Sequence, residues 1–161
     1  MDFLKNKKIL VIGAHSDDEV LGVGGTIQKH IREGHSVTVI YITDGFYDDA
    51  DDDRVSSKRK NATDAMNMLG VTKIIFLGFK GLRLDTYEKC LLNAELTNKF
   101  KEIKPKIVYT HHWGDVNFDH QIVFDMTLVA CRPHRGMQIE ALFTYETLSS
   151  TEWAAPNRDS S

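Results

Sequence analysis

The chain has 161 residues, of which 42% are hydrophobic and 27% are charged, and its formal net charge at pH 7 is −3. A chain of this length fits one domain that buries about two-thirds of its unfolded surface. The slightly negative charge excludes a strongly basic protein, so nucleic acid and anionic membranes are not expected as main partners.

Apolar runs and stretches with helical spacing alternate along the chain. Strands are predicted at 8–13, 36–43, 73–77, 106–110 and 139–145, and helices at 19–33, 56–69, 87–103 and 119–131. This alternation favours the α/β class, with a Rossmann-like three-layer fold in which helices cover both faces of a mainly parallel sheet. We expect one domain over residues 1–153 and a disordered tail at 154–161.

A first polar cluster follows the first predicted strand directly. His15, Asp17 and Asp18 come after the apolar run 9–12, at the carboxyl end of a strand, where open α/β sheets bind ligands. His15 and Asp18 lie three apart on a tight turn and can aim at one point, as metal ligands must. Asp17 is then free to handle a proton. The alternative is that these acids only complement the start of a helix.

Three glycines follow this cluster, at positions 22, 24 and 25. A dinucleotide-binding fingerprint needs glycine at the strand-to-helix turn, where this chain carries His15 and Asp17 instead. The glycines are therefore expected to let the first helix pack closely against the sheet, and nucleotide binding is disfavoured.

A second polar cluster, at 110–120, follows another apolar strand and contains three histidines and two aspartates. Because the carboxyl ends of parallel strands meet at one edge of a sheet, both clusters should contribute to one site. His120 is the third candidate metal ligand. The sequence therefore predicts a metal-dependent hydrolase.

Two motifs resemble a known family. They are His15-Ser16-Asp17-Asp18-Glu19 and His112-x-x-Asp115-x-Asn117-x-Asp119-His120, and they resemble the signature of the PIG-L/LmbE-like N-acetylglucosaminyl deacetylases. The resemblance extends from about residue 7 to residue 153. It implies Zn²⁺ bound by His15, Asp18 and His120, with Asp17 as general base. It further implies that a metal-bound water removes the N-acetyl group of an N-acetylglucosamine-type amino sugar or its conjugate.

The chain departs from the family pattern near the second motif. Asn117 stands where many members have a histidine, and an amide can donate a hydrogen bond to an oxyanion but cannot carry a proton. His112 is a candidate substitute. Asp115, Asp119 and Arg132 are expected to support the ligands or to contact the substrate, although Asp119 could instead cap the following helix.

The expected partner is a small-molecule amino sugar. A related amidase acting on a thiol–sugar conjugate and a metal-binding but inactive family member are the alternative functions. The sequence shows no apolar run as long as a membrane span and no signal peptide, and its two cysteines suggest a reducing compartment, so a cytoplasmic protein is expected. Homo-oligomerisation stays open, and the acidic run at 48–53 is expected to form a solvated loop.

Overall fold

The structure is a computed structural model that describes residues 6–47, 51–133 and 136–153. The expected tail at 154–161 and residues 48–50 of the acidic run lie outside the described residues. All the strands and helices expected from the sequence lie within the described residues.

Five parallel strands form a single sheet in the order β3-β2-β1-β4-β5. They are β1 (Lys8–Gly13), β2 (Ser36–Thr43), β3 (Lys73–Phe79), β4 (Ile107–His111) and β5 (Ala141–Tyr145). All five lie where the apolar runs predict them, and the expected α/β fold with a parallel sheet is confirmed. The order places β1 beside β4, so two segments far apart in the sequence become neighbours at the centre of the sheet.

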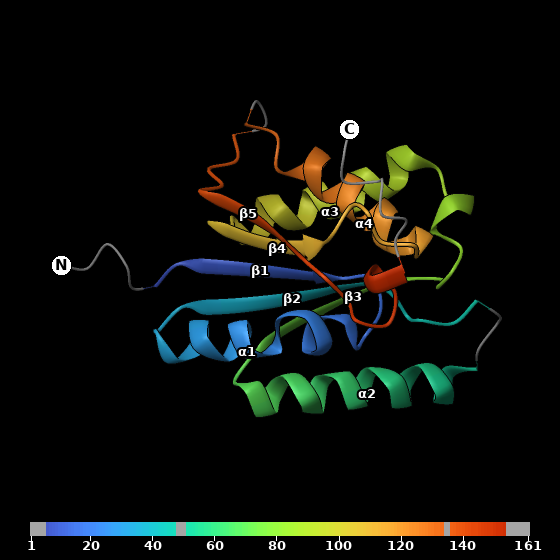
Figure 1. Cartoon of the computed structure of the whole chain (residues 1–161), viewed down its shortest axis with the longest axis horizontal. Helices are drawn as coiled ribbons and strands as arrows, with labels where there is room; N and C mark the ends of the chain where they lie inside the picture. Colours follow the sequence, from blue (N-terminus) through green and yellow to red (C-terminus); the bar gives the residue numbers. More distant parts are fainter. Residues whose placement is uncertain (1–5, 48–50, 134–135, 154–161) are drawn as a thin grey trace.

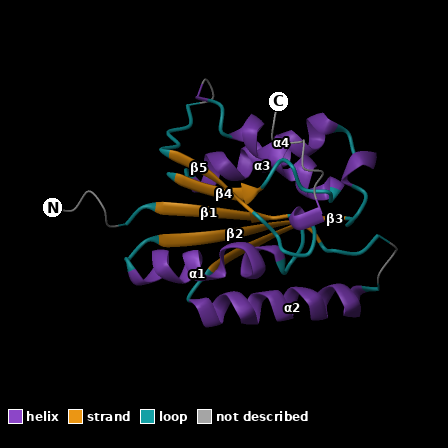
Figure 2. Ribbon diagram, in the orientation of Figure 1, coloured by secondary structure: helices purple, strands orange, loops and turns teal. Residues whose placement is uncertain are grey.

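Helices cover both faces of the sheet, with α1 and α2 on one side and α3 and α4 on the other (Figure 1 and Figure 2). Their bounds are α1 (Asp18–Arg32), α2 (Asp52–Leu69), α3 (Lys89–Ile103) and α4 (Phe118–Ala130). Short 3-10 turns lie at η1 (Leu84–Thr86) and η3 (Thr151–Trp153). None of the described helices is both long and apolar enough to cross a membrane.

Strand β1 is buried on both faces, which explains its unbroken apolar run. Ile9 and Val11 pack into the core under α1 and α2, whereas Leu10 and Ile12 pack into the core under α3 and α4. Successive side chains of a strand point to opposite faces, so β1 connects the two cores. Because β1 is packed on both faces, the polar residues that follow it are held at a fixed place at the carboxyl end of the strand.

Helix α2 begins earlier than its spacing predicts. The side chain of Asp51 accepts a hydrogen bond from the backbone nitrogen of Arg54 at 2.8 Å, so it caps the helix before position 56. Asp52 and Asp53 lie in the first helical turn, where their charges complement the helix dipole. The expectation of a loop over the whole acidic run is therefore wrong for these two residues.

Close packing of α1 on the sheet depends on one of the three glycines. A Cβ atom on Gly22 would lie 2.3 Å from Cδ2 of Tyr145, whose ring is buried at the end of β5. A Cβ atom on Gly25 would meet no described atom within 4 Å. The close-packing expectation is thus confirmed for Gly22 and wrong for Gly25.

Candidate metal centre

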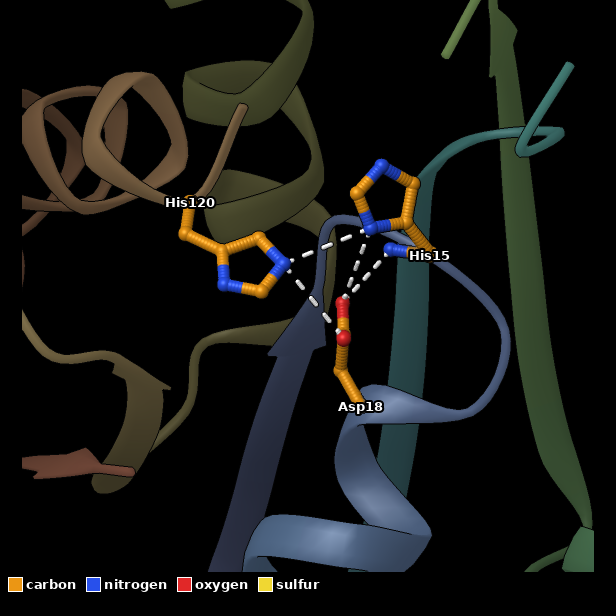
Figure 3. A group of neighbouring side chains, drawn as sticks. All are labelled: His15, Asp18 and His120. Carbon is orange, nitrogen blue, oxygen red and sulfur yellow. Dashed lines mark hydrogen bonds and ion pairs between the residues drawn. The ribbon is translucent and has the colours of Figure 1, made fainter. Parts of the chain in front are cut away.

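The two polar clusters meet at the carboxyl edge of the sheet, where β1 and β4 end side by side (Figure 1). His15 lies in the turn after β1, and Asp18 is the first residue of α1. His120 lies in the first turn of α4, just after the loop that follows β4. Figure 3 shows the three side chains pointing toward one another.

The three side chains have the spacing of a metal site. His15 Nδ1 lies 3.3 Å from His120 Nε2, His120 Nε2 lies 3.4 Å from Asp18 Oδ1, and His15 Nδ1 lies 3.5 Å from Asp18 Oδ2. Ligands of tetrahedral zinc at about 2.0–2.1 Å would be about 3.3–3.4 Å apart. One ligand atom from each residue lies within 4.8 Å of the others. Two imidazoles and a carboxylate thus fit a divalent metal ion in both chemistry and distance.

His15 is held in place by a carboxylate on its far side. Its Nε2 is 3.0 Å from Asp119 Oδ2, and Asp119 also accepts backbone hydrogen bonds from Leu82 at 2.6 Å and Leu84 at 3.3 Å. Burial lowers the pKa of His15, but hydrogen bonds to Asp119 and Asp18 outweigh it and raise the pKa to about 9. Without a metal, an imidazolium ion therefore occupies this side of the site at neutral pH.

His120 has a carboxylate partner of its own. Its Nδ1 lies 2.9 Å from Asp115 Oδ2, which also accepts hydrogen bonds from the hydroxyls of Ser150 at 2.9 Å and Thr151 at 2.6 Å. Asp115 is fully buried, and although its burial raises its pKa, these hydrogen bonds hold the pKa well below its usual range. A carboxylate that accepts from Nδ1–H leaves the lone pair of His120 on Nε2, which faces the other two candidate ligands.

His111 is a site residue that the sequence reasoning missed. It is fully buried, stacks on His120 with ring centroids 3.8 Å apart, and places Nε2 3.2 Å from Asp18 Oδ2. The same nitrogen accepts a hydrogen bond from the backbone of Ala14 at 2.9 Å. A histidine at the end of a buried strand was the available signal, but its contacts depend on the pairing of β1 with β4.

Asp17 occupies the N-cap position of α1, yet its side chain makes no capping hydrogen bond among the described residues. Asp17 is exposed and directly precedes Asp18 in the chain. Asn117 is the N-cap of α4, and its Oδ1 accepts from the backbone nitrogen of Asp119 at 2.9 Å. The capping role that Asp119 could have had therefore belongs to Asn117.

His112 and Arg132 lie differently from these residues. His112 follows β4 directly, and its Nδ1 accepts from the backbone nitrogen of Gly114 at 3.1 Å while its ring lies 5.5 Å from that of Trp113. Arg132 is exposed and follows the C-terminal end of α4, whereas His120 lies at its N-terminal end. The expected contact of Arg132 with the ligands or the substrate therefore stays a prediction.

A cleft of about 420 Å³ adjoins the centre and is bordered by Asp119. Leu82, Val116 and Phe118 supply its apolar wall, whereas Asp85, Asn117 and Ser150 supply polar groups. Such mixed lining suits a small molecule with both apolar and hydroxylated faces.

The fold and the site together define a class of protein. It is a Rossmann-like α/β domain that carries a His–Asp–His cluster where its two central strands end. Residues 10–131 match the family model PIG-L, described as GlcNAc-PI de-N-acetylase. The chain belongs to this family, which confirms the resemblance seen in its motifs.

Individual relatives agree with this assignment. The chain is 30% identical over 154 residues to "Uncharacterized deacetylase YaiS" of Escherichia coli, covering 91% of this chain and 77% of that protein. It is 27% identical over 141 residues to a 1D-myo-inositol 2-acetamido-2-deoxy-alpha-D-glucopyranoside deacetylase of Nocardioides, covering 66% and 47%. Among solved structures, N,N'-diacetylchitobiose deacetylase of Pyrococcus horikoshii superposes with a TM-score of 0.67 at 27% identity, covering 77% and 49%. The chain thus spans about half the length of the last two proteins.

Proposed function

We propose that the protein is a zinc-dependent N-deacetylase that hydrolyses the acetamide of an N-acetylglucosamine-type sugar or its conjugate. Membership of the PIG-L family and relatives that are named as deacetylases of acetylated amino sugars support the reaction class. The observation that carries the proposal is the triangle of His15, Asp18 and His120, whose spacing suits a tetrahedral ion.

His15, Asp18 and His120 would hold the ion, and three protein ligands leave a position open for water or substrate. When bound, zinc supplies a Lewis acid that polarises a carbonyl oxygen and brings the pKa of a coordinated water to about 7. Asp119 and Asp115 fix the rings of His15 and His120 by accepting hydrogen bonds from their outer nitrogens.

Asp17 is the proposed general base. Asp17 is exposed, directly precedes Asp18 in the chain, and is not used for helix capping among the described residues. It would take a proton from the attacking water, whose oxygen forms a bond to the acetamide carbon. The same proton would then pass to the nitrogen as the C–N bond breaks, which releases acetate and the free amine.

Asn117 and His112 are the proposed donors to the carbonyl oxygen that develops negative charge. Asn117 uses its Oδ1 for the backbone of Asp119, so its two N–H bonds are the groups it can offer. His112 Nδ1 accepts from the backbone of Gly114, so Nε2 is the ring nitrogen proposed to donate. Donors of this kind typically lower the barrier by several kcal/mol.

Acetate release from a panel of N-acetylglucosamine derivatives tests the function. Zinc-loaded protein should release acetate, and Asp17→Asn should lower kcat by roughly 10²–10⁴-fold while zinc stoichiometry stays the same. Asp125→Asn, an exposed aspartate on α4, is the matched control and should leave kcat unchanged. If Asp17→Asn released acetate as fast as the parent protein, Asp17 would not be the general base. A zinc-loaded protein that releases no acetate would instead favour the inactive alternative.

A further inference from the structure

A second group of metal-ligating side chains lies at the opposite edge of the sheet, where α1 ends and β2 begins. Glu33 caps the end of α1, and Gly34 adopts a left-handed φ of 82°. The backbone nitrogens of Gly34 and His35 donate to the carbonyls of Ile31 and His30, each at 3.0 Å. This turn reverses the chain at the helix end. It brings the ring of His35 to 5.2 Å from that of His30.

One ring nitrogen of His30 is hydrogen-bonded, and the other has no partner among the described residues. Its Nε2 lies 2.9 Å from the hydroxyl of Tyr109, which comes from β4. Its Nδ1 is buried and has no hydrogen-bond partner within the described part of the chain. A buried nitrogen of this kind normally has a hydrogen-bond partner, so a partner from outside the described residues is expected here.

His35 and Glu33 complete the group. The side chain of His35 is only 8% exposed, and its Nε2 lies 3.7 Å from Glu33 Oε2. One ligand atom from each of His30, Glu33 and His35 lies within 4.8 Å of the others.

We propose that His30, Glu33 and His35 form a second metal site, separate from the candidate catalytic centre, that binds a transition-metal ion such as Zn²⁺. Two imidazole nitrogens and one carboxylate oxygen are a ligand set that suits Zn²⁺, Ni²⁺ or Cu²⁺. Mg²⁺ and Ca²⁺ prefer ligand sets made of oxygen atoms alone. Burial and the neighbouring His35 lower the pKa of His30, which favours the neutral ring that a metal ion needs.

Two contacts compete with binding of the metal ion. They predict that this site binds the ion more weakly than the candidate catalytic centre does. Lys29 Nζ lies 4.0 Å from Glu33 Oε1, and His35 Nδ1 accepts from the backbone nitrogen of Lys7 at 3.2 Å. Coordination through Nε2 would move the ring proton to Nδ1 and break the bond to Lys7. Within the described part of the chain, neither histidine has a carboxylate on its far side like those of the first centre, so we expect affinity roughly 10–100-fold lower.

The proposed role of this ion is structural. It would join the end of α1 to the start of β2 and, through the hydroxyl of Tyr109, to β4. An ion that binds only the folded chain raises its stability by mass action. The site therefore has a readout, the metal-dependent rise in Tm, that does not involve hydrolysis.

Titration of the full metal-free chain with Zn²⁺, followed by calorimetry and by Tm, tests the proposal. The parent chain should bind two ions with different affinities. His120→Gln should lose the tighter ion, and His35→Gln should lose the weaker one. Because His35 is largely buried, Glu33→Gln provides an exposed second variant whose folding is not at risk, and it should weaken the second ion at least tenfold. Lys29→Gln is the charge control. It removes a positive charge near Glu33 and should therefore increase the affinity for the second ion.

Two outcomes would overturn the second site. One is binding of a single ion by the parent chain. The other is a second ion whose affinity is the same in His35→Gln and Glu33→Gln, because that ion would then bind elsewhere. Neither outcome bears on the deacetylase proposal, which rests on His15, Asp18 and His120.

Discussion

Each of the two candidate histidine ligands is paired with an aspartate, one from the loop after β4 and one from the first turn of α4. Asp119 accepts from Nε2 of His15, and Asp115 accepts from Nδ1 of His120. The two rings thus present different nitrogens to the candidate centre, Nδ1 of His15 and Nε2 of His120, and each ring is fixed by its own carboxylate. Such outer partners set the tautomer and raise the basicity of a metal-binding imidazole. Metal affinity should therefore depend on both the protonation of the rings and the integrity of these pairs.

The first consequence is a pH dependence of metal binding. The pKa of His15 is raised to about 9 in the metal-free site, so a metal ion must displace a proton at neutral pH. We expect zinc affinity to rise about tenfold per pH unit between about pH 7 and about pH 9, and then to level off. Calorimetry in two buffers with different ionisation enthalpies would measure the released proton. An affinity that stays constant across this interval would contradict the prediction.

The second consequence concerns Asp115. Replacing it by asparagine puts an amide next to Nδ1–H of His120 and disturbs the bonds from Ser150 and Thr151. Asp115→Asn should lower zinc affinity roughly 10–100-fold. It should also cost about 1–3 kcal/mol of unfolding free energy, because buried donors lose a charged acceptor. Asp125→Asn is the matched control, and equal zinc affinity in the two variants would refute the role of Asp115.

At the scale of the elements, α1 contacts β5 through a position without a side chain. Gly22 faces the buried ring of Tyr145, whose hydroxyl donates to the carbonyl oxygen of Ile12 at 2.8 Å. The ring therefore cannot move away without breaking a buried hydrogen bond. This contact fixes the helix whose first residue, Asp18, is a candidate metal ligand.

Two alanine substitutions on α1 should have opposite effects. Gly22→Ala places a methyl group 2.3 Å from Tyr145 Cδ2, so it should destabilise the fold by about 1–3 kcal/mol through overpacking. Gly25→Ala meets no described atom within 4 Å and should stabilise it by up to about 1 kcal/mol, because alanine favours the helix. Urea unfolding measures both changes. Equal effects would mean that helix propensity alone governs α1.

At the scale of the whole molecule, one buried acid makes folding sensitive to pH. Glu19 is fully buried, and Tyr41 donates a hydrogen bond to its Oε1 at 2.5 Å. Its Oε2 has no partner among the described residues. Burial raises the pKa of Glu19 from 4.5 to about 7. The folded chain therefore keeps a proton over a range of pH in which the unfolded chain has lost it.

The contribution of the Glu19 proton to the free energy of unfolding is fully present below about pH 4.5. It is lost as the pH rises toward 7. Glu19→Gln keeps an oxygen that can accept from Tyr41 but cannot ionise. Relative to the parent, this variant should gain on the order of 3 kcal/mol between about pH 5 and about pH 8. Denaturant unfolding of metal-free protein measures the difference, with the exposed Glu102→Gln as control. A difference between parent and variant that does not change with pH would contradict the prediction.

Much of this architecture could be predicted from the sequence, because apolar runs fix the strands and the strand ends fix the site. His15, Asp18 and His120 could be chosen for this reason. His111 could not, since its contacts to Asp18 and His120 require the pairing of β1 with β4. Helix starts were less predictable because capping side chains such as Asp51 and Asn117 decide them locally.

The strand order has a consequence for how the protein matures. Ile9 pairs with Ile107 at the centre of the sheet, and the two candidate histidines are 105 residues apart in the chain. Contacts this distant in sequence form slowly, because a long loop must close before they yield any stabilisation. A chain still emerging from the ribosome therefore cannot complete the candidate metal site before His120 has been synthesised and β4 has docked. Metallation would then be a late event, and it would mark chains whose central strands have already paired.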